Sequence, residues 1–446
     1  MPSDLHVIVG LGATGFACAR YLKAQGIPMA IIDTRSNPPQ LAALQKDYPD
    51  VSVALGGFDT TLLERAAKII LSPGISLREP AIAAQIKRGT PVVGDIELFA
   101  QAINQPVIAI TGTNAKSTVT TLVGQMVAAA GCHVQVGGNL GVPALDLISK
   151  DKVIDVFVLE LSSFQLETTY SLQPHVATVL NVTPDHMDRY QDLAEYQQAK
   201  HRVYQHCHTA VCNRDDPLTD YTDASLRRKL YFTMDKPQQN EFGLLTREGE
   251  VYLAYEDEPL LAVAELPVAG KHYQANALAS LAISRGFGLP FTPMLQTLRE
   301  FKGLPHRCQL VRERDGVKWY NDSKGTNVGA TQAAILGLGS DISGKLILIA
   351  GGVGKNADFS PLVPVMEKYA RHVVLIGEAA PELARVIGNR IPTSFARTME
   401  EAVQQAAEAA RANDSVLLSP ACASFDMFKH YEHRGEVFME VVRKLC

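Results

Sequence analysis

Short apolar runs alternate with stretches of helical spacing along the first part of the chain. Alternation of this kind predicts βαβ units and a parallel sheet. The predicted strands are 6–9, 29–32, 68–71 and 91–93. The pattern ends near residues 95–101, and Asn104-Gln105-Pro106 is typical of a linker.

A second α/β pattern begins at Val107. Its predicted strands are 107–110, 153–159 and 176–180, with a helix predicted over 273–285. Residues 230–268 look different, because their apolar runs are spaced like antiparallel strands around Arg247-Glu248-Gly249. The predicted antiparallel strands are 231–233, 243–246 and 250–255.

A third α/β pattern follows Lys302-Gly303-Leu304-Pro305, which predicts a second boundary. Its strands are predicted at 317–320, 345–350, 372–376 and 415–418. A chain of 446 residues is expected to form about three domains. The sequence therefore predicts three α/β units in series, at 1–95, 96–303 and 304–446.

Composition and charge exclude several classes of protein. Apolar residues make up 46% of the chain and charged residues 20%, which is ordinary for a globular protein with an ample core. The formal net charge of −5 argues against a nucleic-acid-binding protein, which carries a basic face. No apolar run approaches the ~20 residues that cross a membrane, and the N-terminus lacks a signal-peptide pattern.

The cysteines indicate a reducing compartment. The 7 cysteines form no Cys-x-x-Cys pair, and their odd number suits free thiols in a cytosol. Cys207 and Cys212 lie near His201, His206 and His208, but this spacing matches no zinc pattern. We therefore expect a soluble cytoplasmic protein that binds neither nucleic acid nor a membrane.

Residues 111–118 read Thr-Gly-Thr-Asn-Ala-Lys-Ser-Thr and lie between a predicted strand and a predicted helix. This order is typical of a nucleotide triphosphate site, because backbone N–H groups and the helix N-terminus face the phosphates. Lys116 would reach the terminal phosphates, and Ser117 or Thr118 would bind Mg²⁺. The alternative is a helix N-terminus with an ordinary surface lysine.

This loop departs from the standard pattern at one position. Ala115 stands where a glycine usually precedes the lysine. Alanine tolerates a positive φ poorly. The loop is therefore expected either to turn there in an ordinary backbone conformation or to be strained.

A glycine-rich turn, Gly10-Leu-Gly12-Ala-Thr-Gly15, follows the first predicted strand, and Asp33 ends the second. This pattern recognises a diphosphate next to a ribose, so a nucleotide-diphosphate sugar satisfies it as well as a nicotinamide cofactor. A tight turn without a ligand is the alternative. Thr34 and Arg35 add donors close to that site, and Ser72-Pro73-Gly74 ends another strand, where open sheets place ligand-binding loops.

Three polar side chains in the second unit are candidates for catalysis. Glu160 ends a predicted strand, where a carboxylate is well placed to hold Mg²⁺, although a solvated acid is the alternative. His186 lies in Asp-His-Met-Asp-Arg after the next strand and is a candidate metal ligand or substrate contact. Lys200 lies in a charged helical stretch, and composition alone predicts an exposed lysine.

Polar turns follow three strands of the third unit, at 321–327, 351–355 and 419–426. The second is not a Walker loop, because only two residues separate its first glycine from the Gly-Lys pair. A lysine held there would suit a carboxylate. Cys422 has no base near it in the sequence, so we expect a packed thiol and not a nucleophile.

Together these motifs resemble those of the Mur ligases, the ATP-dependent enzymes that add amino acids during peptidoglycan synthesis. The resemblance covers nearly the whole chain, at 33–35, 111–118, 159–166, 183–190, 306–307, 321–327, 351–360 and 418–429. It implies an α/β fold of three domains: a small Rossmann-like N-terminal domain for a UDP-sugar, a P-loop ATPase-like central domain with a small antiparallel part, and a Rossmann-like C-terminal domain.

The resemblance also implies the roles of individual residues. The UDP-sugar site would contain Thr14, Asp33, Thr34, Arg35, Ser72, Gly74, Asn139 and Ser162. The ATP site would contain Gly112, Thr113, Asn114, Lys116, Ser117, Thr118, Asn276, Arg307 and Asp322. The amino-acid site would contain Lys324, Thr326, Lys355, Ser424 and Phe425. The catalytic residues would be Lys116, Glu160, His186 and Lys200, and Mg²⁺ or Mn²⁺ would bind Ser117, Glu160, His186 and a carbamylated Lys200.

Within the family, the motifs resemble most those of the ligases that add D-glutamate to UDP-N-acetylmuramoyl-L-alanine through an acyl phosphate, with ATP as co-substrate. A monomer is expected, in which domain closure brings Arg307, Lys324 and Lys355 to the ATP. Other amino-acid-adding Mur ligases and folylpolyglutamate synthase-like ligases are the alternatives in the same class. A nicotinamide-dependent dehydrogenase and a P-loop switch are the alternatives from other classes.

Two further departures from the family pattern bear on local contacts. Tyr273 stands where an asparagine is often found near the adenine, and Gly325 replaces a common alanine. Together with the alanine of the phosphate loop, they affect individual contacts and leave the expected reaction unchanged.

Overall fold

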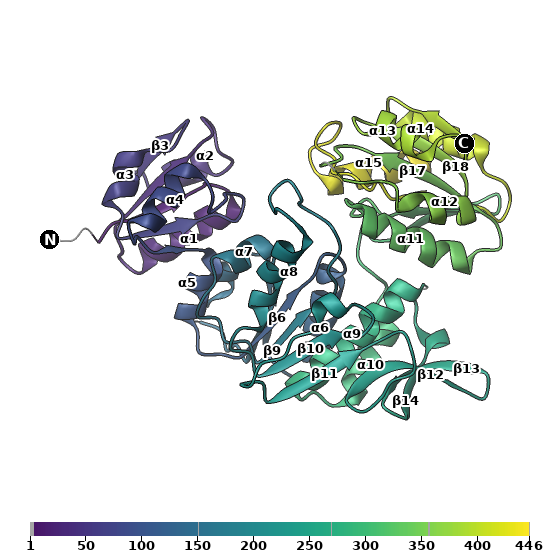
Figure 1. Cartoon of the computed structure of the whole chain (residues 1–446), viewed down its shortest axis with the longest axis horizontal. Coiled ribbons are helices and arrows are strands. Elements are labelled where there is room, and N and C mark those ends of the chain that lie inside the picture. Colours follow the sequence, from purple (N-terminus) through teal and green to yellow (C-terminus); the bar gives the residue numbers. More distant parts are fainter. Residues whose placement is uncertain (1–3, 150, 269, 356, 446) are drawn as a thin grey trace.

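The computed structural model describes residues 4–149, 151–268, 270–355 and 357–445. Three sheets follow one another along the chain, each covered by helices (Figure 1). The expected three-part α/β architecture is therefore confirmed, while the exact limits of the three units stay a prediction. Among the helices of these residues, none is both long and apolar enough to cross a membrane.

The first sheet is parallel, with the strand order β3-β2-β1-β4-β5. Its strands are β1 (His6–Val9), β2 (Met29–Asp33), β3 (Ser52–Leu55), β4 (Lys68–Leu71) and β5 (Val92–Val93). Its helices are α1 (Ala13–Ala24), α2 (Leu41–Asp47), α3 (Thr60–Arg65) and α4 (Pro80–Lys87), and α5 (Asp95–Ala102) leads to the second sheet. The strand order reverses beside β1, which is where open sheets form a binding crevice.

The second sheet has nine strands in the order β14-β13-β12-β11-β10-β9-β6-β8-β7. Its strands are β6 (Val107–Thr111), β7 (Val134–Gly138), β8 (Val156–Glu160), β9 (Val176–Val179), β10 (Thr209–Asn213), β11 (Arg228–Phe232), β12 (Glu241–Arg247), β13 (Glu250–Tyr255) and β14 (Glu258–Ala262). Its helices are α6 (Lys116–Ala129), α7 (Ser163–Glu167), α8 (Leu193–His201), α9 (Lys271–Phe287) and α10 (Phe291–Glu300).

The expected antiparallel set in this region was wrong in one strand. The strand predicted at 231–233 is part of β11, which pairs in parallel with both β10 and β12. Only β12, β13 and β14 are antiparallel, and they extend the parallel sheet at one edge. The local spacing of apolar runs does not fix strand direction, because β11 also pairs with β10, a partner that the spacing within 230–268 does not reveal.

The third sheet has the order β15-β16-β20-β17-β18-β19, and only β15 and β16 are antiparallel. Its strands are β15 (Gln309–Arg314), β16 (Val317–Asn321), β17 (Leu346–Gly351), β18 (Ala370–Ile376), β19 (Thr393–Phe395) and β20 (Ser415–Leu418). Its helices are α11 (Val328–Asp341), α12 (Leu362–Tyr369), α13 (Ala380–Ile387), α14 (Met399–Ala409) and α15 (Tyr431–Lys444).

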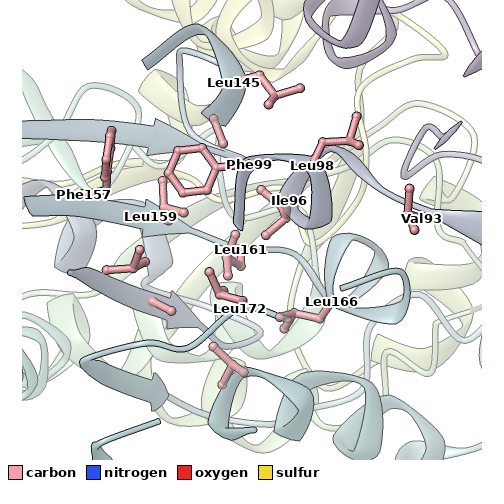
Figure 2. Packing of buried hydrophobic residues seen from close by; sticks show 14 of the residues in the cluster. Val93, Ile96, Leu98, Phe99, Leu145, Phe157, Leu159, Leu161, Leu166 and Leu172 are labelled. Atoms are coloured by element: carbon pink, nitrogen blue, oxygen red, sulfur yellow. The ribbon is translucent and has the colours of Figure 1, made fainter. Parts of the chain in front are cut away.

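One continuous apolar cluster joins the first sheet to the second. Helix α5 brings Phe99 against Phe157 of β8, with ring centroids 5.0 Å apart in an edge-to-face arrangement. Figure 2 shows these rings among Leu159, Leu161 and Leu166, all of them buried. Burial of such rings and side chains is worth roughly 1.5–3 kcal/mol each, so the first two units share a core that fixes their relative position.

Candidate active site

The loop between β6 and α6 forms the floor of a cavity of about 310 Å³, called here the central cavity. Predicted site residues that line it are Thr113, Asn114, Lys116, Ser117, Asn139, Glu160, Ser162, His186, Lys200, Arg307, Lys324, Thr326 and Lys355. They come from segments far apart in the sequence, because the carboxyl ends of parallel strands meet at one edge of a sheet.

Ala115 has a left-handed backbone, with φ 68° and ψ −9°. Of the two expectations for this loop, the strained one is therefore confirmed. A left-handed conformation costs an L-residue about 1–2 kcal/mol relative to a right-handed one. The conformation lets Lys116 begin α6 immediately afterwards.

Lys116 folds back over its own loop. Its Nζ donates hydrogen bonds to the carbonyl oxygens of Gly112 and Thr113, each at 2.8 Å. Burial lowers the pKa of Lys116, and the nearby Glu160 acts in the opposite direction. Ser117 Oγ accepts a hydrogen bond from Arg307 Nη2 at 2.8 Å, so the C-terminal part of the chain already contacts the phosphate loop.

Lys200 is buried, with 1% of its surface exposed, so the expectation of an exposed lysine was wrong. Its Nζ donates to Gly112 O at 2.8 Å and lies 4.3 Å from the centre of the Tyr196 ring. Burial lowers the pKa of Lys200 well below its usual value, and the charge of Lys116 adds to this effect. The signal was absent from the local sequence, because residues distant in the chain bury this side chain.

Glu160 presents one unsatisfied carboxylate oxygen at the cavity. Its Oε1 accepts a hydrogen bond from Asn139 Nδ2 at 2.6 Å, while Oε2 is buried without a partner among the described residues. A buried, unsatisfied oxygen of this kind is costly unless a cation or donor completes it. Glu160 is therefore suited to a divalent metal ion.

The turn after β9 brings His186 and Asp185 to the same cavity. His186 has a positive φ of 58°, and its ring lies 4.9 Å from that of Phe164. Burial lowers the pKa of His186, although Asp185 opposes the change. The neutral form is thereby favoured, and neutral imidazole is the form that binds metal ions.

Asp185 forms an ion pair with Lys355 across the gap between the second and third sheets. Lys355 Nζ lies 3.1 Å from Asp185 Oδ1, and Asn327 Nδ2 donates to Asp185 Oδ2, also at 3.1 Å. Burial alone would raise the pKa of Asp185, but Lys355, His186 and Lys116 together outweigh burial, and the pKa is lowered. The third sheet thus already delivers its cations to the cavity, as domain closure was expected to do.

Lys324 lies with its Nζ 3.7 Å from the ring centre of Tyr431, at the start of α15. Burial lowers the pKa of Lys324 to about 8, and Arg307 contributes. Tyr431 was not among the residues predicted for the site. Its position close after the last polar turn was the one available signal.

Six of the residues predicted for the ATP and amino-acid sites do not line the central cavity: Gly112, Thr118, Asn276, Asp322, Ser424 and Phe425. Asp322 is buried, and its carboxylate accepts hydrogen bonds from Ser419 Oγ at 2.7 Å and Cys308 N at 3.2 Å. Burial raises the pKa of Asp322 to about 6. Phe425 is 74% exposed.

The structure accounts locally for the two other departures from the family pattern. A Cβ on Gly325 would lie 2.6 Å from Ser419 Oγ and 2.7 Å from Asp322 Oδ2, so an alanine requires a shift there. The Tyr273 ring is buried in the core and stacks on Phe301, with centroids 6.1 Å apart.

A second cavity, of about 530 Å³, lies at the crevice of the first sheet and is called here the N-terminal cavity. Predicted residues that line it are Thr14, Asp33, Thr34, Arg35, Ser72, Gly74 and Asn139. Pro73 and Asn139 line both cavities, so the two share a wall. Two ligands bound in them would therefore meet at this wall.

Asp33 is fixed at the end of β2. Its Oδ2 accepts from Leu11 N and from Arg35 Nη2, both at 2.7 Å. Burial would raise the pKa of Asp33, but the bonds from Arg35 and Leu11 lower it to about 2. Gly15 must be glycine, because a Cβ there would lie 1.9 Å from Gly10 O. The turn thus has the close approach that a diphosphate site needs.

Cations outnumber carboxylates at the central cavity. The cationic side chains are Lys116, Arg307, Lys324 and Lys355, beside the buried Lys200 whose lowered pKa favours the neutral amine, and the carboxylates are Glu160 and Asp185. Preorganised cations in a partly enclosed site stabilise developing negative charge. The arrangement suits a polyphosphate together with a carboxylate substrate.

Three family models match the chain in order along its length. They are "Mur ligase MurD-like, N-terminal domain" at residues 4–94, "Mur ligase middle domain" at 110–284, and "Mur ligase, glutamate ligase domain" at 306–422. Together they cover most of the chain.

Similar proteins carry the name UDP-N-acetylmuramoylalanine--D-glutamate ligase. One from Pseudomonas putida is 52% identical over 443 residues, which cover 99% of this chain and 98% of the relative. One from Pseudomonas aeruginosa is 52% identical over 441 residues, with the same coverage of 99% and 98%. One from Nitrosococcus oceani is 53% identical over 439 residues, covering 98% and 96%.

Solved structures share the fold. UDP-N-acetylmuramate-alanine ligase MurC from Thermotoga maritima has a TM-score of 0.62 and 18% identity, covering 99% of both chains. MurF ligase from the same organism has a TM-score of 0.62 and 18% identity, covering 99% of this chain and 96% of that one. Because the family models match most of the sequence and the relatives exceed half identity along it, the chain belongs to the Mur ligase family.

Proposed function

We propose that this chain joins D-glutamate to UDP-N-acetylmuramoyl-L-alanine, acting in the cytoplasm as a monomer. As a member of its family, it is an ATP-dependent ligase that forms an amide bond in peptidoglycan synthesis. One observation carries the proposal. The central cavity holds a phosphate loop on one side and lysines of the third sheet on the other, and it shares a wall with the cavity of the first sheet.

The two cavities divide the substrates between them. The N-terminal cavity would bind the UDP-sugar, with the diphosphate at the Gly10–Gly15 turn and Asp33 and Arg35 holding the nucleoside. Its L-alanyl carboxylate would then extend past Pro73 and Asn139 into the central cavity. ATP would lie along the phosphate loop, and Lys355 would exchange Asp185 for a carboxylate of D-glutamate.

The donor set fits the Mg²⁺ that the family implies. Ser117, Glu160 and His186 would hold the ion, since the free Glu160 oxygen and a neutral imidazole face the same cavity. Lys200 would add a fourth ligand if its amine forms a carbamate, which turns an ammonium into a carboxylate. When bound, the metal ion would neutralise charge on the phosphates.

Phosphoryl transfer would be the first step. The L-alanyl carboxylate oxygen attacks the γ-phosphorus of ATP, and the bond to ADP breaks. Lys116, Arg307 and Lys324 would offset the negative charge on the transferring group. Holding the carboxylate against the phosphate loop replaces a bimolecular encounter with a positioned one.

Amide formation would follow in the same cavity. The neutral amine of D-glutamate attacks the acyl carbon, the tetrahedral adduct expels inorganic phosphate, and the nitrogen loses a proton. Lys355 would orient the incoming amino acid through its carboxylate. Lys324 would stay beside the departing phosphate.

Phosphate release from ATP tests the proposal. The assay contains Mg²⁺, UDP-N-acetylmuramoyl-L-alanine and D-glutamate, with each component omitted in turn. We expect release only with all components, and a product heavier by one glutamyl residue. Activity with a longer precursor and L-lysine or diaminopimelate in place of D-glutamate would retain the family and refute the substrate.

A further inference from the structure

The loop at residues 72–75 forms part of the wall between the two cavities. It follows β4, and its Pro73 lines both cavities while Ile75 lines the N-terminal one. The loop belongs to the first sheet, yet two of its carbonyl oxygens face Arg189, which lies in the segment between β9 and α8 of the second sheet. Its position therefore decides how the contents of the two cavities meet.

Arg189 holds this loop from the side of the second sheet. Its Nη1 donates to Pro73 O at 2.7 Å, and its Nη2 lies 3.4 Å from Ile75 O. The same Nη2 donates to Glu167 Oε2 at 2.7 Å. Only 12% of the Arg189 side chain is exposed, so these charge-assisted bonds are little screened by solvent.

The guanidinium also reaches the wall of the central cavity. It lies over the Phe164 ring, 4.0 Å from the centroid, and Phe164 contacts the ring of His186 at 4.9 Å. A main-chain hydrogen bond also connects Arg189 to His186, because Arg189 N donates to His186 O at 2.9 Å. Arg189 thus joins Pro73, on the sugar side, to the neighbours of His186, on the phosphate side.

Glu167 orients the guanidinium from behind. Its Oε1 accepts a bond from Tyr190 Oη at 2.6 Å, which leaves Oε2 directed at Arg189. A planar guanidinium can serve two carbonyl oxygens, a carboxylate and an aromatic face at once. A lysine ammonium in the same place has no plane to stack and reaches fewer acceptors.

We propose that Arg189 is a positioning residue that fixes the 72–75 loop against Phe164 and so sets where the UDP-sugar carboxylate enters the central cavity. It touches neither set of reacting atoms and acts through Pro73 and Phe164. The inference rests on the proposed function, because it assumes that the two cavities hold the sugar nucleotide and ATP.

Two variants of Arg189 and one control variant test this role. Arg189→Ala removes all contacts, and Arg189→Lys keeps the charge but not the plane. Arg78→Ala is the control, because Arg78 crosses the same boundary to Arg189 O and Glu195 with 52% of its side chain exposed. Circular dichroism and thermal unfolding establish that each variant is folded.

The readouts are the KM of each substrate, kcat, and binding of UDP-N-acetylmuramoyl-L-alanine without ATP. For Arg189→Ala we expect a sugar-nucleotide KM and Kd raised about tenfold and a kcat lowered by about 10- to 100-fold, the scale that a 1 Å misplacement produces. The KM for ATP should change less than about twofold. Arg189→Lys should lie between Arg189→Ala and wild type, and Arg78→Ala should match wild type within about twofold.

The outcomes separate the two levels of inference. Equal constants for Arg189→Ala and Arg78→Ala would overturn the positioning role while wild-type activity upheld the proposed function. An equal rise in KM for all three substrates would also overturn the positioning role, since that pattern indicates general destabilisation. A wild-type protein that does not bind the sugar nucleotide would refute the proposed function itself.

Discussion

Lys116 and Lys200 donate to one and the same acceptor, the carbonyl oxygen of Gly112, and each Nζ lies 2.8 Å from it. Two ammonium groups side by side repel each other, and burial adds to the cost of the charged forms. The pKa of Lys200 is lowered well below its usual value for both reasons. A neutral Lys200 amine is a nucleophile, which is the form that CO₂ requires.

Activity is expected to depend on CO₂. Wild-type enzyme in CO₂-depleted buffer should lose activity and regain it when bicarbonate is added, because a carbamate on Lys200 would complete the proposed anionic ligands around the metal ion. Intact-protein mass spectrometry should detect the added CO₂ under native conditions. Lys200→Met serves as the control and should be at least about 10-fold less active, with no response to bicarbonate. Equal wild-type activity with and without CO₂ would remove the carbamate from the mechanism.

Lys355→Ala should raise the KM for D-glutamate strongly while leaving the binding of the sugar nucleotide intact. The ammonium that now pairs with Asp185 at 3.1 Å is the group that would receive the substrate carboxylate. Losing a charge-assisted bond of this kind costs about 1.5–3 kcal/mol, which is roughly a 10- to 100-fold change. Lys368→Ala, on the exposed face of α12, is the control. An unchanged KM would exclude Lys355 from the amino-acid site.

Asp95 makes the protein less stable as the pH rises. Burial at the start of α5 raises the pKa of Asp95 to about 6, from 3.8. Stability is therefore greatest below the unfolded pKa and is lost as the pH rises through 6, by an amount on the order of 3 kcal/mol. Asp95→Asn should raise the melting temperature by a few degrees at pH 8 and by about half as much at pH 5.

Thermal unfolding across this pH range checks the effect. Asp257→Asn is the control, because the Asp257 side chain is 89% exposed. A gain from Asp95→Asn that stays constant with pH would show that packing, and not the carboxyl charge, is responsible. Since Asp95 accepts a bond from Gln165 Nε2 at 3.1 Å, the asparagine must turn its oxygen toward that amide.

The left-handed Ala115 predicts different effects for two substitutions. Ala115→Gly removes strain of about 1 kcal/mol and adds a similar unfolded-state entropy, so the melting temperature and the KM for ATP should stay close to wild type. Ala115→Val places a β-branched side chain at φ 68°. The melting temperature should therefore fall, and the KM for ATP should rise. A harmless valine would show that the loop leaves the left-handed conformation in solution.

The sequence predicted most of the strands that are buried on both faces, with β10 as the exception. Continuous apolar runs such as those of β6, β8 and β17 are readable without the fold. Most of the strands not predicted, β3, β7, β14, β15 and β19, lie at sheet edges, where polar residues interrupt the pattern. The direction of the strands in the central sheet could not be predicted from the local sequence either, because strand pairing depends on partners distant in the chain.

The site was readable only where its chemistry lies in one continuous motif. The phosphate loop, Glu160 and His186 were predictable because each follows a predicted strand. The burial of Lys200 and the stacking of Lys324 on Tyr431 depend on contacts between segments far apart in sequence. Local sequence gives a residue's type, whereas its charge state depends on neighbours that only the fold supplies.

The wall shared by Pro73 and Asn139 restricts how this enzyme can evolve resistance to an inhibitor. Under the proposed division of substrates between the cavities, a compound that spans both would contact residues that serve two substrates at once. A substitution there that excludes the compound also disturbs the meeting of the sugar nucleotide with the phosphate loop. A single resistance substitution at this wall would therefore also lower activity. A compound confined to one cavity would allow more resistance substitutions that keep the activity.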